Sequence, residues 1–406
     1  MFAGIQACLA EDTLTEDAAN KNWLPRQLSL HAFGTLGASY HHEDGIEYRR
    51  NVEQKNGVSP HQIDFSSDSV IGAQADLAIN EKLSASLQLA SRNNAYNNWK
   101  PEVITAFVKY SPTESVDIRV GRMLGEANIG GESPYTGYSY VNIRPTPEVF
   151  GLLTSYQRYQ GVDIQYKHPI FGGVGRIKAS YGKVIGERYI TGISDHVNAN
   201  NSILMLAWQS DNLEIHAARS ETHVHDFTGA LALSSALAAT PFPSAQQRAQ
   251  EISDTQDHTI IVSGMSAEYA INQFKFIGIY GKFSTGNLPT YHGESSSLLA
   301  SYRFGNITPF LMVAKTYFTP ENRSLILPPI PQVQSLVAGY DFLTNVLTTK
   351  QSTISAGFRY EINDNTAFKL QIDHIKASNT PTILSTRPLG ENKDLFLMSA
   401  ALDFIF

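Results

Sequence analysis

Apolar and polar residues alternate along most of this chain, and the alternation predicts a large set of amphipathic β-strands. Residues 116–122 (VDIRVGR) and 162–166 (VDIQY) change character at every step. A period of two places neighbouring side chains on opposite faces of a strand. Similar segments recur from residue 28 to the C-terminus. We therefore expect a protein made mainly of strands that have one apolar and one polar face.

Short turns alternate with long connections between these segments. Counting the segments gives sixteen strands, with both ends of the chain on the same side of the barrel. An even number of antiparallel strands with this pattern of connections is what a closed transmembrane barrel requires. The short turns lie at 80–82, 112–115, 210–212, 305–306 and 363–365.

Two of the long connections are predicted to contain a helix. Within 318–351, the apolar residues Val333, Leu336, Val337 and Tyr340 recur at helical spacing, which favours one long loop with a helix over an extra strand. Within 221–257, the small apolar residues 229–239 suit a short helix.

The outward faces of the predicted strands suit a membrane. On the fourth strand, Ile104, Ala106, Val108 and Tyr110 are predicted to face outward. Aromatic residues near the short turns are typical of the girdle at a membrane boundary. A soluble β-protein is the alternative, but it would bury its aromatic residues in mid-strand. The predicted girdle contains Tyr110, Tyr166, Tyr269, Phe274, Tyr302, Phe304, Tyr360, Phe368, Phe404 and Phe406.

Composition narrows the class of protein further. The 406 residues carry a formal net charge of -7, so no broad basic surface suggests nucleic acid. No apolar run is long enough for a transmembrane helix, whereas the segments suit barrel strands. Charged residues make up 17% of the chain, and it contains 19 Tyr and 20 Phe. A single cysteine, Cys8, excludes a disulfide framework within the chain.

The N-terminal segment, 1–26, is interpreted as a tail that precedes the barrel at 27–406. Residues 2–10 form a short apolar stretch before Glu11, like the end of a secretory signal without its basic part. A remnant of a signal peptide or a misplaced start codon is the preferred interpretation. A lipid-attachment motif at Cys8 is the alternative.

On these residues, the chain resembles the trimeric porins of Gram-negative bacteria over nearly its whole length. The final residues, 399–406 (SAALDFIF), are similar to the porin assembly signal, although Ala401 stands where Gly is frequent. The long connection after the fifth strand has the position of the inward-folded third loop. Segments VDIRVGRM, NIRPTPEVFG and ISAGFRYEINDNTAFKLQ loosely resemble the phosphate-selective and dicarboxylate-type branch.

The resemblance implies an all-β, 16-stranded antiparallel transmembrane barrel with short periplasmic turns and long extracellular loops. It implies a homotrimer in the bacterial outer membrane, in contact with lipid and lipopolysaccharide, with both termini periplasmic. The function implied is passive diffusion of small hydrophilic solutes, with neither cofactor nor turnover. The third loop, predicted at 126–160, would narrow the water-filled pore.

Alternation and loop position together give the candidate residues of the pore. Clustered guanidinium groups at a constriction favour anions, particularly carboxylates and phosphates. Acidic loop residues facing a basic wall would instead give a general pore with little selectivity, so both alternatives stay open. The candidates are Asp117, Arg119, Arg122, Glu132, Tyr135, Tyr138, Tyr140, Arg144, Glu148, Arg176, Lys178 and Arg359.

The sequence gives less support to other kinds of site. His223 and His225 have the spacing that places two imidazoles on one strand face, but we interpret them as loop residues rather than metal ligands. No spacing singles out a nucleophile, so an outer-membrane enzyme is not favoured. A barrel whose lumen is occluded by the long loops at 221–257 or 318–351 remains an alternative.

Overall fold

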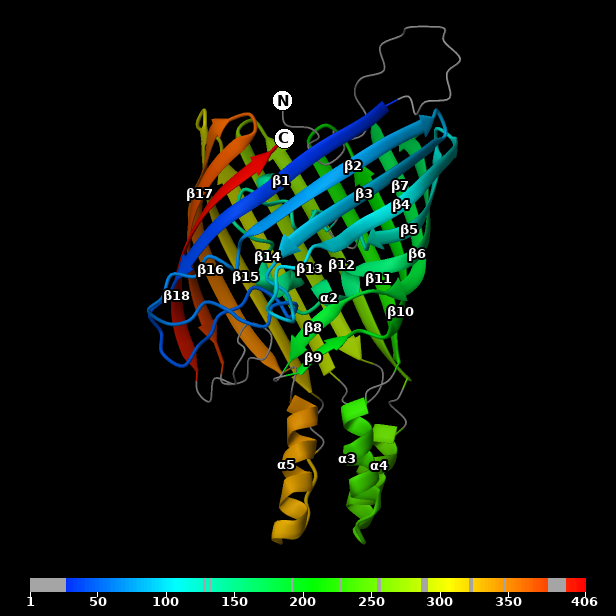
Figure 1. The fold of residues 1–406 in the computed structure, drawn as a ribbon, viewed down its shortest axis with the longest axis vertical. Coiled ribbons are helices and arrows are strands. Elements are labelled where there is room, and N and C mark those ends of the chain that lie inside the picture. The colour runs from blue at the N-terminus through cyan, green and yellow to red at the C-terminus, as the bar shows by residue number, and fades with distance from the viewer. Residues whose placement is uncertain are drawn as a thin grey trace, which may run out of the picture.

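The chain forms a closed barrel of sixteen antiparallel strands in a computed structural model, which confirms the predicted all-β fold (Figure 1). The structure describes residues 27–126, 129–131, 133–190, 193–225, 228–253, 257–285, 291–320, 324–345, 348–378 and 392–406. The predicted tail at 1–26 lies outside these residues.

The barrel strands pair in chain order, and β18 pairs with β1 to close the sheet. The first eight are β1 (Gln27–Tyr40), β2 (Val70–Asn80), β3 (Leu83–Arg92), β4 (Glu102–Thr113), β5 (Val116–Leu124), β6 (Arg158–Ile170), β7 (Gly173–Val184) and β10 (Ala199–Gln209). The second eight are β11 (Leu213–His225), β12 (Asp257–Ile271), β13 (Phe274–Thr285), β14 (Tyr291–Tyr302), β15 (Ile307–Pro320), β16 (Thr349–Asn363), β17 (Thr366–Ala377) and β18 (Lys393–Ile405). A separate hairpin that the sequence did not predict, β8 (Glu187–Ile190) with β9 (Ile193–His196), lies between β7 and β10.

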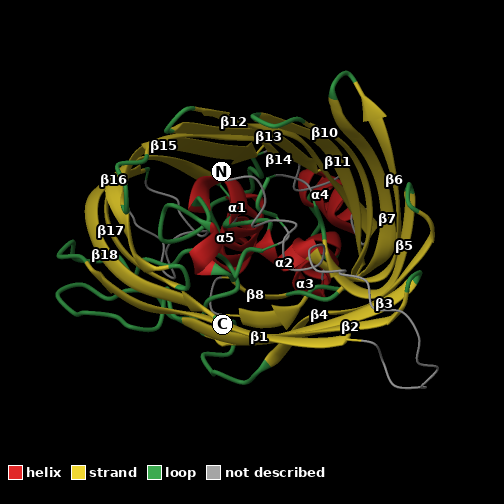
Figure 2. Cartoon of the chain, turned by 90° about the horizontal axis from the view of Figure 1, so that it is seen from above, coloured by secondary structure: helices red, strands yellow, loops and turns green. Residues whose placement is uncertain are grey.

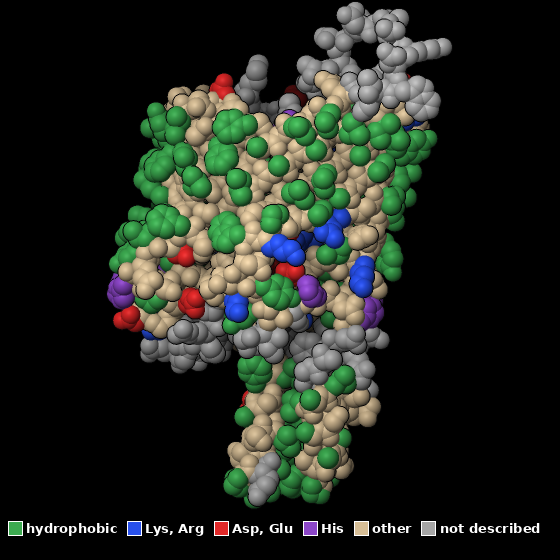
Figure 3. All heavy atoms as spheres, in the orientation of Figure 1, with side chains coloured by type: hydrophobic (Ala, Val, Ile, Leu, Met, Phe, Trp, Pro, Cys, Tyr) green, Lys and Arg blue, Asp and Glu red, His purple; other side chains and the backbone are tan. Residues whose placement is uncertain are grey.

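The alternation of residue types becomes an alternation of burial. Outward side chains such as Leu30, Val120 and Leu298 are exposed, whereas inward Asp163 and Gln371 are buried. Figure 3 shows hydrophobic side chains over the barrel wall and charged ones nearer the end from which helices project. An apolar outer wall around a polar interior is the arrangement of a transmembrane barrel.

The face predicted for Ile104 is wrong. Ile104 was expected to point outward with Ala106 and Val108, but it is fully buried inside the barrel, in a cluster with Phe33 and other apolar residues. The β3–β4 register shifts between Gln88 and Leu89. Such an irregularity reverses the face of every residue beyond it, and the period-two pattern alone does not reveal it.

Three helices project from the barrel end opposite to the short turns (Figure 1). They are α3 (Thr228–Ala238), α4 (Pro243–Ser253) and α5 (Pro331–Asn345), and they share an apolar cluster that includes Leu237, Ala249 and Tyr340. The helices predicted in both long loops are confirmed by α3 and α5, while α4 was not predicted. Among the described residues, no helix has the length and apolar character needed to cross a membrane.

Three shorter helices lie in the connection between β5 and β6. They are the 3-10 helix η1 (Gly137–Ser139), α1 (Pro147–Phe150) and α2 (Thr154–Gln157). Viewed from above, α1 and α2 lie within the ring of strands (Figure 2). The connection therefore enters the barrel. Because β5 ends at Leu124 and β6 begins at Arg158, the connection comprises residues 125–157, whereas 126–160 was predicted.

Candidate functional site

Loop 3, residues 125–157, touches the barrel wall on several sides. The backbone N–H of Ile129 donates to Ser266 Oγ on β12 at 3.1 Å, and that of Ile143 donates to Gln371 Oε1 on β17 at 2.9 Å. The Tyr138 hydroxyl donates to the carbonyl of Asp364 at a short turn, at 2.6 Å. Because β12 and β17 lie on different sides of the ring, loop 3 runs across the lumen.

Arg144 anchors loop 3 to Asp68, which lies just before β2, and to Asp373, Ser399 and Ser39 of the wall strands β17, β18 and β1. Its guanidinium donates to both carboxylate oxygens of Asp68 at 2.8 Å and to Asp373 at 3.0 Å. The side chain is only 1% exposed. Burial lowers the pKa of Arg144, but the carboxylate of Asp68 raises it, and the net pKa lies above the usual value. Arg144 is therefore a charged group whose hydrogen bonds are taken up within the protein.

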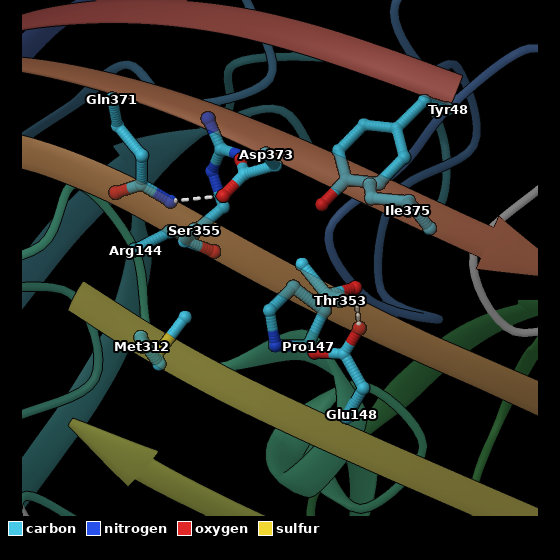
Figure 4. Close-up of a pocket in the computed structure, with 10 residues that line it drawn as sticks. All are labelled: Tyr48, Arg144, Pro147, Glu148, Met312, Thr353, Ser355, Gln371, Asp373 and Ile375. Carbon is cyan, nitrogen blue, oxygen red and sulfur yellow. Dashed lines mark hydrogen bonds and ion pairs between the residues drawn. The ribbon is translucent and has the colours of Figure 1, made fainter. Parts of the chain in front are cut away.

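Glu148, on α1, is a buried carboxyl that forms no ion pair with any residue that the structure describes. Gln351 Nε2 donates to Glu148 Oε1 at 2.6 Å, and Thr353 donates to the same oxygen. Its other oxygen has no partner among the described residues, and it borders a cavity of about 10 Å³ that Arg144 and Asp373 also line (Figure 4). That volume suits about one water molecule. Burial raises the pKa of Glu148.

Acidification should strengthen the attachment of α1 to the wall through Glu148. A carboxyl with a raised pKa binds its proton more tightly when buried, so the buried position is favoured at low pH. This stabilisation of the buried position is lost as the pH rises from 4.5, the ordinary pKa of a glutamate, through the raised pKa of Glu148. If α1 narrows the pore, single-channel conductance should rise with pH over this window, and Glu148→Gln should remove the dependence. Glu221→Gln, a change at an outward carboxylate, is the control, and an unchanged pH profile in Glu148→Gln would contradict the prediction.

The three candidate tyrosines of loop 3 are held by protein contacts. Tyr135 donates to Glu53 at 2.9 Å, and the Arg92 guanidinium lies 4.6 Å from its ring centroid. The Arg359 guanidinium lies 4.2 Å from the ring centroid of Tyr138. The Tyr140 hydroxyl donates to the carbonyl of Gly130 at 2.8 Å. These contacts order loop 3, since each aromatic ring has a fixed partner.

Arg359 also bonds loop 3 directly, from the wall. Its Nη1 donates to the carbonyl oxygens of Tyr138 and, at 3.0 Å, Tyr140. Lys369, on the adjacent β17, donates to the carbonyls of Gly137 and Asn142 and pairs with Asp403 at 2.8 Å. Lysine and arginine from two wall strands thus hold the loop backbone. These cations serve as structural donors, and Lys369 was not among the predicted site residues.

The remaining wall candidates form ion pairs with acidic residues of the barrel wall or of loop 3. Arg119 Nη2 lies 2.8 Å from Asp163, and Lys178 lies 2.8 Å from Glu126 at the start of loop 3. Arg176 pairs with Glu214 at 3.0 Å.

Three further candidates have different surroundings. Asp117 pairs with Lys167 at 3.0 Å. Arg122 was predicted to line the pore, but it pairs in the ladder with Ala106 and Gln160 on the outer face, and its guanidinium donates to the Val103 carbonyl. Glu132 lies outside the described residues.

A second loop enters the lumen, and the sequence reasoning treated it only as a polar segment. Loop 1, residues 41–69, buries Ile46, Tyr48 and Val58 against β17 and β18, near the strand ends that are away from the short turns. Val52 packs in an apolar cluster with side chains of β7, β11, β12, β13 and β15, on the opposite wall. The apolar residues Ile46, Tyr48, Val52 and Val58 of this otherwise polar segment were the sign in the sequence that loop 1 folds inward.

Glu53 links loop 1 to three other parts of the barrel interior. Its carboxylate lies 2.7 Å from Arg92 on β3 and 3.1 Å from Arg158 on β6, and it accepts the Tyr135 hydroxyl of loop 3. Glu102 bridges the same two arginines, at 3.3 and 2.6 Å. All of these charged side chains except Glu102 are at least 95% buried, so the network is closed off from solvent over most of its surface.

His223 lies in a different setting from the lumen residues. Its ring hydrogen-bonds to Thr259 on the adjacent strand at 3.0 Å, and it belongs to β11 rather than to a loop as the sequence suggested. Among the described residues, no three His, Cys, Asp or Glu side chains gather in a way that could hold a metal ion.

Together these features define a transmembrane β-barrel whose lumen contains inward-folded loops anchored by ionic contacts. Residues 18–380 match the family model described as Gram-negative porin. The chain belongs to that family, as the sequence predicted, and it is an outer-membrane channel protein for passive diffusion. A search of curated protein sequences found no match to this chain.

Solved structures share the fold at low sequence identity. Salmonella typhi OmpF, in a complex with daunomycin, has a TM-score of 0.56 and 14% identity, covering 93% of this chain and 97% of its own. The anion-selective porin from Comamonas acidovorans has a TM-score of 0.56 and 13% identity, covering 94% and 99%. OmpT of Vibrio cholerae, in its trimer form, has a TM-score of 0.53 and 8% identity, covering 94% and 99%.

Proposed function

We propose that loop 3 narrows the water-filled lumen, so that the channel passes only small hydrophilic solutes by passive diffusion. The observation that carries this proposal is the buried Arg144 anchor, which ties the loop to Asp68 and Asp373 inside the barrel. A loop with such an anchor occupies cross-section that would otherwise conduct. Loop 1 occupies further space through Val52 and Glu53.

A preference for anions is the second candidate. Inward cations remain partly exposed along β5, β6 and β7: Arg119 by 18%, Lys167 by 33% and Arg176 by 21%. Their acidic partners Asp163 and Asp117 are more buried, by contrast, at 1% and 13% exposure. A passing ion would therefore meet more positive than negative surface on this wall, which favours anions.

The assembly proposed is a homotrimer in the outer membrane. Small outward residues gather on β18, β1, β2 and β3, among them Ala400, Ala32, Ala73 and Ala85. Small side chains let neighbouring barrels approach closely, which suits an interface within a membrane. The trimer form of the Vibrio cholerae protein supports the same assembly.

The orientation proposed places both termini and the short turns in the periplasm, with residues 1–26 as a periplasmic tail. Outward basic side chains then reach the outer leaflet: Lys282 and Lys376, on β13 and β17, are each 63% exposed. Such groups suit the phosphates of lipopolysaccharide.

Single-channel current in a planar bilayer tests the channel and its selectivity together. Wild-type protein should give stepwise openings and a reversal potential of anion-selective sign across a salt gradient. Arg119→Ala leaves the Asp163 carboxylate without its three hydrogen bonds from Arg119 and should shift the reversal potential toward cations. Arg219→Ala, on the exposed outer face, is the matched control. Equal reversal potentials in all three proteins would exclude the anion preference at this wall and leave a general pore.

A further inference from the structure

Arg50 of loop 1 differs from the other arginines near the lumen. It is only 9% exposed, yet no described residue lies within hydrogen-bond or ion-pair distance of its guanidinium; its backbone N–H alone has a partner. Several polar atoms of the described residues are both fully buried and without a hydrogen-bond partner, but the guanidinium nitrogens of Arg50 are not fully buried. They therefore keep a small solvent-accessible surface. An arginine held inside a barrel whose donors no protein acceptor takes up can bind a solute.

The neighbouring arginines have protein partners. Arg92 is paired with Glu53 at 2.7 Å, and Arg144 is paired with Asp68 at 2.8 Å. Both are close enough to Arg50 to interact with it electrostatically. They add positive potential around Arg50, while their own hydrogen bonds are committed to carboxylates.

Asp68 is the acidic group with the largest effect on Arg50, but both of its oxygens already accept hydrogen bonds from other residues. Oδ1 accepts Arg144 Nε at 2.8 Å. Oδ2 accepts Arg144 Nη2 and Ser39 Oγ, each at 2.8 Å. Asp68 thus reduces the cost of burying the Arg50 charge without forming an ion pair with it. No acceptor among the described residues takes a hydrogen bond from the Arg50 guanidinium.

The backbone beside Arg50 is fixed in place. Its N–H donates to Gln54 Oε1 at 3.0 Å, and Gln54 Nε2 donates to the carbonyl of Ser67 at 2.8 Å. Arg49, the preceding residue, donates to the Gln54 carbonyl at 3.0 Å. The backbone position of Arg50 is therefore set before any ligand binds, which lowers the ordering cost of binding.

We propose that Arg50 is an oxyanion-binding residue of this channel, which takes the carboxylate or phosphate group of a small solute where loops 1 and 3 meet. Tyr135 and Tyr140 of loop 3 are close enough to Arg50 to interact with it electrostatically. The planar guanidinium presents paired donors that match two oxygens of one anion. The inference rests on the proposed function, since the solute must enter the lumen to reach Arg50.

The test compares Arg50→Gln and Arg50→Lys with wild type, using inorganic phosphate and succinate as probes. In a chloride bilayer, each probe should reduce the wild-type single-channel current in a concentration-dependent way. Arg50→Gln should raise the half-blocking concentration about tenfold or more, as expected when a charge-assisted contact is lost. Arg50→Lys keeps the charge but not the planar fork, so its value should be intermediate. Arg219→Gln makes the same chemical change on the outer face and should behave as wild type.

Titration calorimetry of the folded full chain in detergent provides a readout that does not need current. Phosphate or succinate should bind wild type and Arg219→Gln, with binding lost in Arg50→Gln. A conducting Arg50→Gln channel that both probes block as in wild type would overturn the inference and leave the channel intact. Folded protein without current would overturn the proposed function, and calorimetry would then decide on Arg50 alone: no binding to wild type would exclude the site. A response to only one probe would assign the site to phosphate or to carboxylate.

Discussion

Arg144→Ala is expected to release loop 3 from the wall and to give a larger, noisier single-channel current. The substitution leaves Asp68 and Asp373 as buried carboxylates without their cation, at 3% and 4% exposure. Removing one partner of a buried ion pair costs about 3–5 kcal/mol. The sixteen-strand ladder does not depend on this contact, so we expect the loop to move and water to enter while the barrel stays closed.

The control for this experiment is Arg219→Ala, which removes an arginine that is 55% exposed on the outer face. Exposed ion pairs contribute little to stability, so its conductance and thermal stability should match wild type. Folding of every variant is checked by its resistance to unfolding in detergent. A folded Arg144→Ala protein with wild-type conductance and noise would contradict the assignment of Arg144 as the anchor of loop 3.

Glu53→Ala is expected to detach the tip of loop 1. It leaves Arg92 and Arg158, which are 3% and 5% exposed, with Glu102 as their common carboxylate, and it removes the acceptor of the Tyr135 hydroxyl. The stabilisation lost should again be about 3–5 kcal/mol. We expect loop 1 to detach in response, because Glu53 holds the segment whose neighbour Val52 contacts the far wall.

Thiol labelling measures this detachment directly. The chain has one cysteine, so a Cys8→Ser background with Val52→Cys carries a single reporter. Val52 is 1% exposed, and its cysteine should be protected in the presence of Glu53 and should react in Glu53→Ala. Glu221→Ala, at an exposed outward carboxylate, is the matched control. Equal protection with and without Glu53 would show that the apolar cluster holds loop 1 by itself.

The barrel could be predicted from the sequence because alternation is a local property. Each strand shows its two faces within about ten residues, and turn lengths then set the order of the strands. The helix α5 could be predicted for the same reason, since Val333, Tyr340 and Leu343 recur at helical spacing and are buried together. The register irregularity that turns Ile104 inward is also local, but it leaves the spacing of apolar residues almost unchanged.

The lumen could be predicted only in part, because its contacts join distant segments. Arg144 was a candidate from its position on the third loop, but its partners Asp68 and Asp373 are 76 and 229 positions away. Loop 1 was missed because its apolar residues find their partners on β17 and β18, at the other end of the chain. A charged residue in a long loop gives no sign, in sequence, of whether it meets an opposite charge or solvent.

Exclusion of neutral polymers from the open channel tests the central claim, that loop 3 narrows an outer-membrane diffusion pore. Polyethylene glycols of increasing size are added to both sides of a bilayer, and the largest one that still lowers the conductance gives the width of the narrowest part. Wild type should give stepwise currents and a small size limit, and Arg144→Ala should give a distinctly larger limit. Equal limits for the two folded proteins, or no current from either of them, would contradict it.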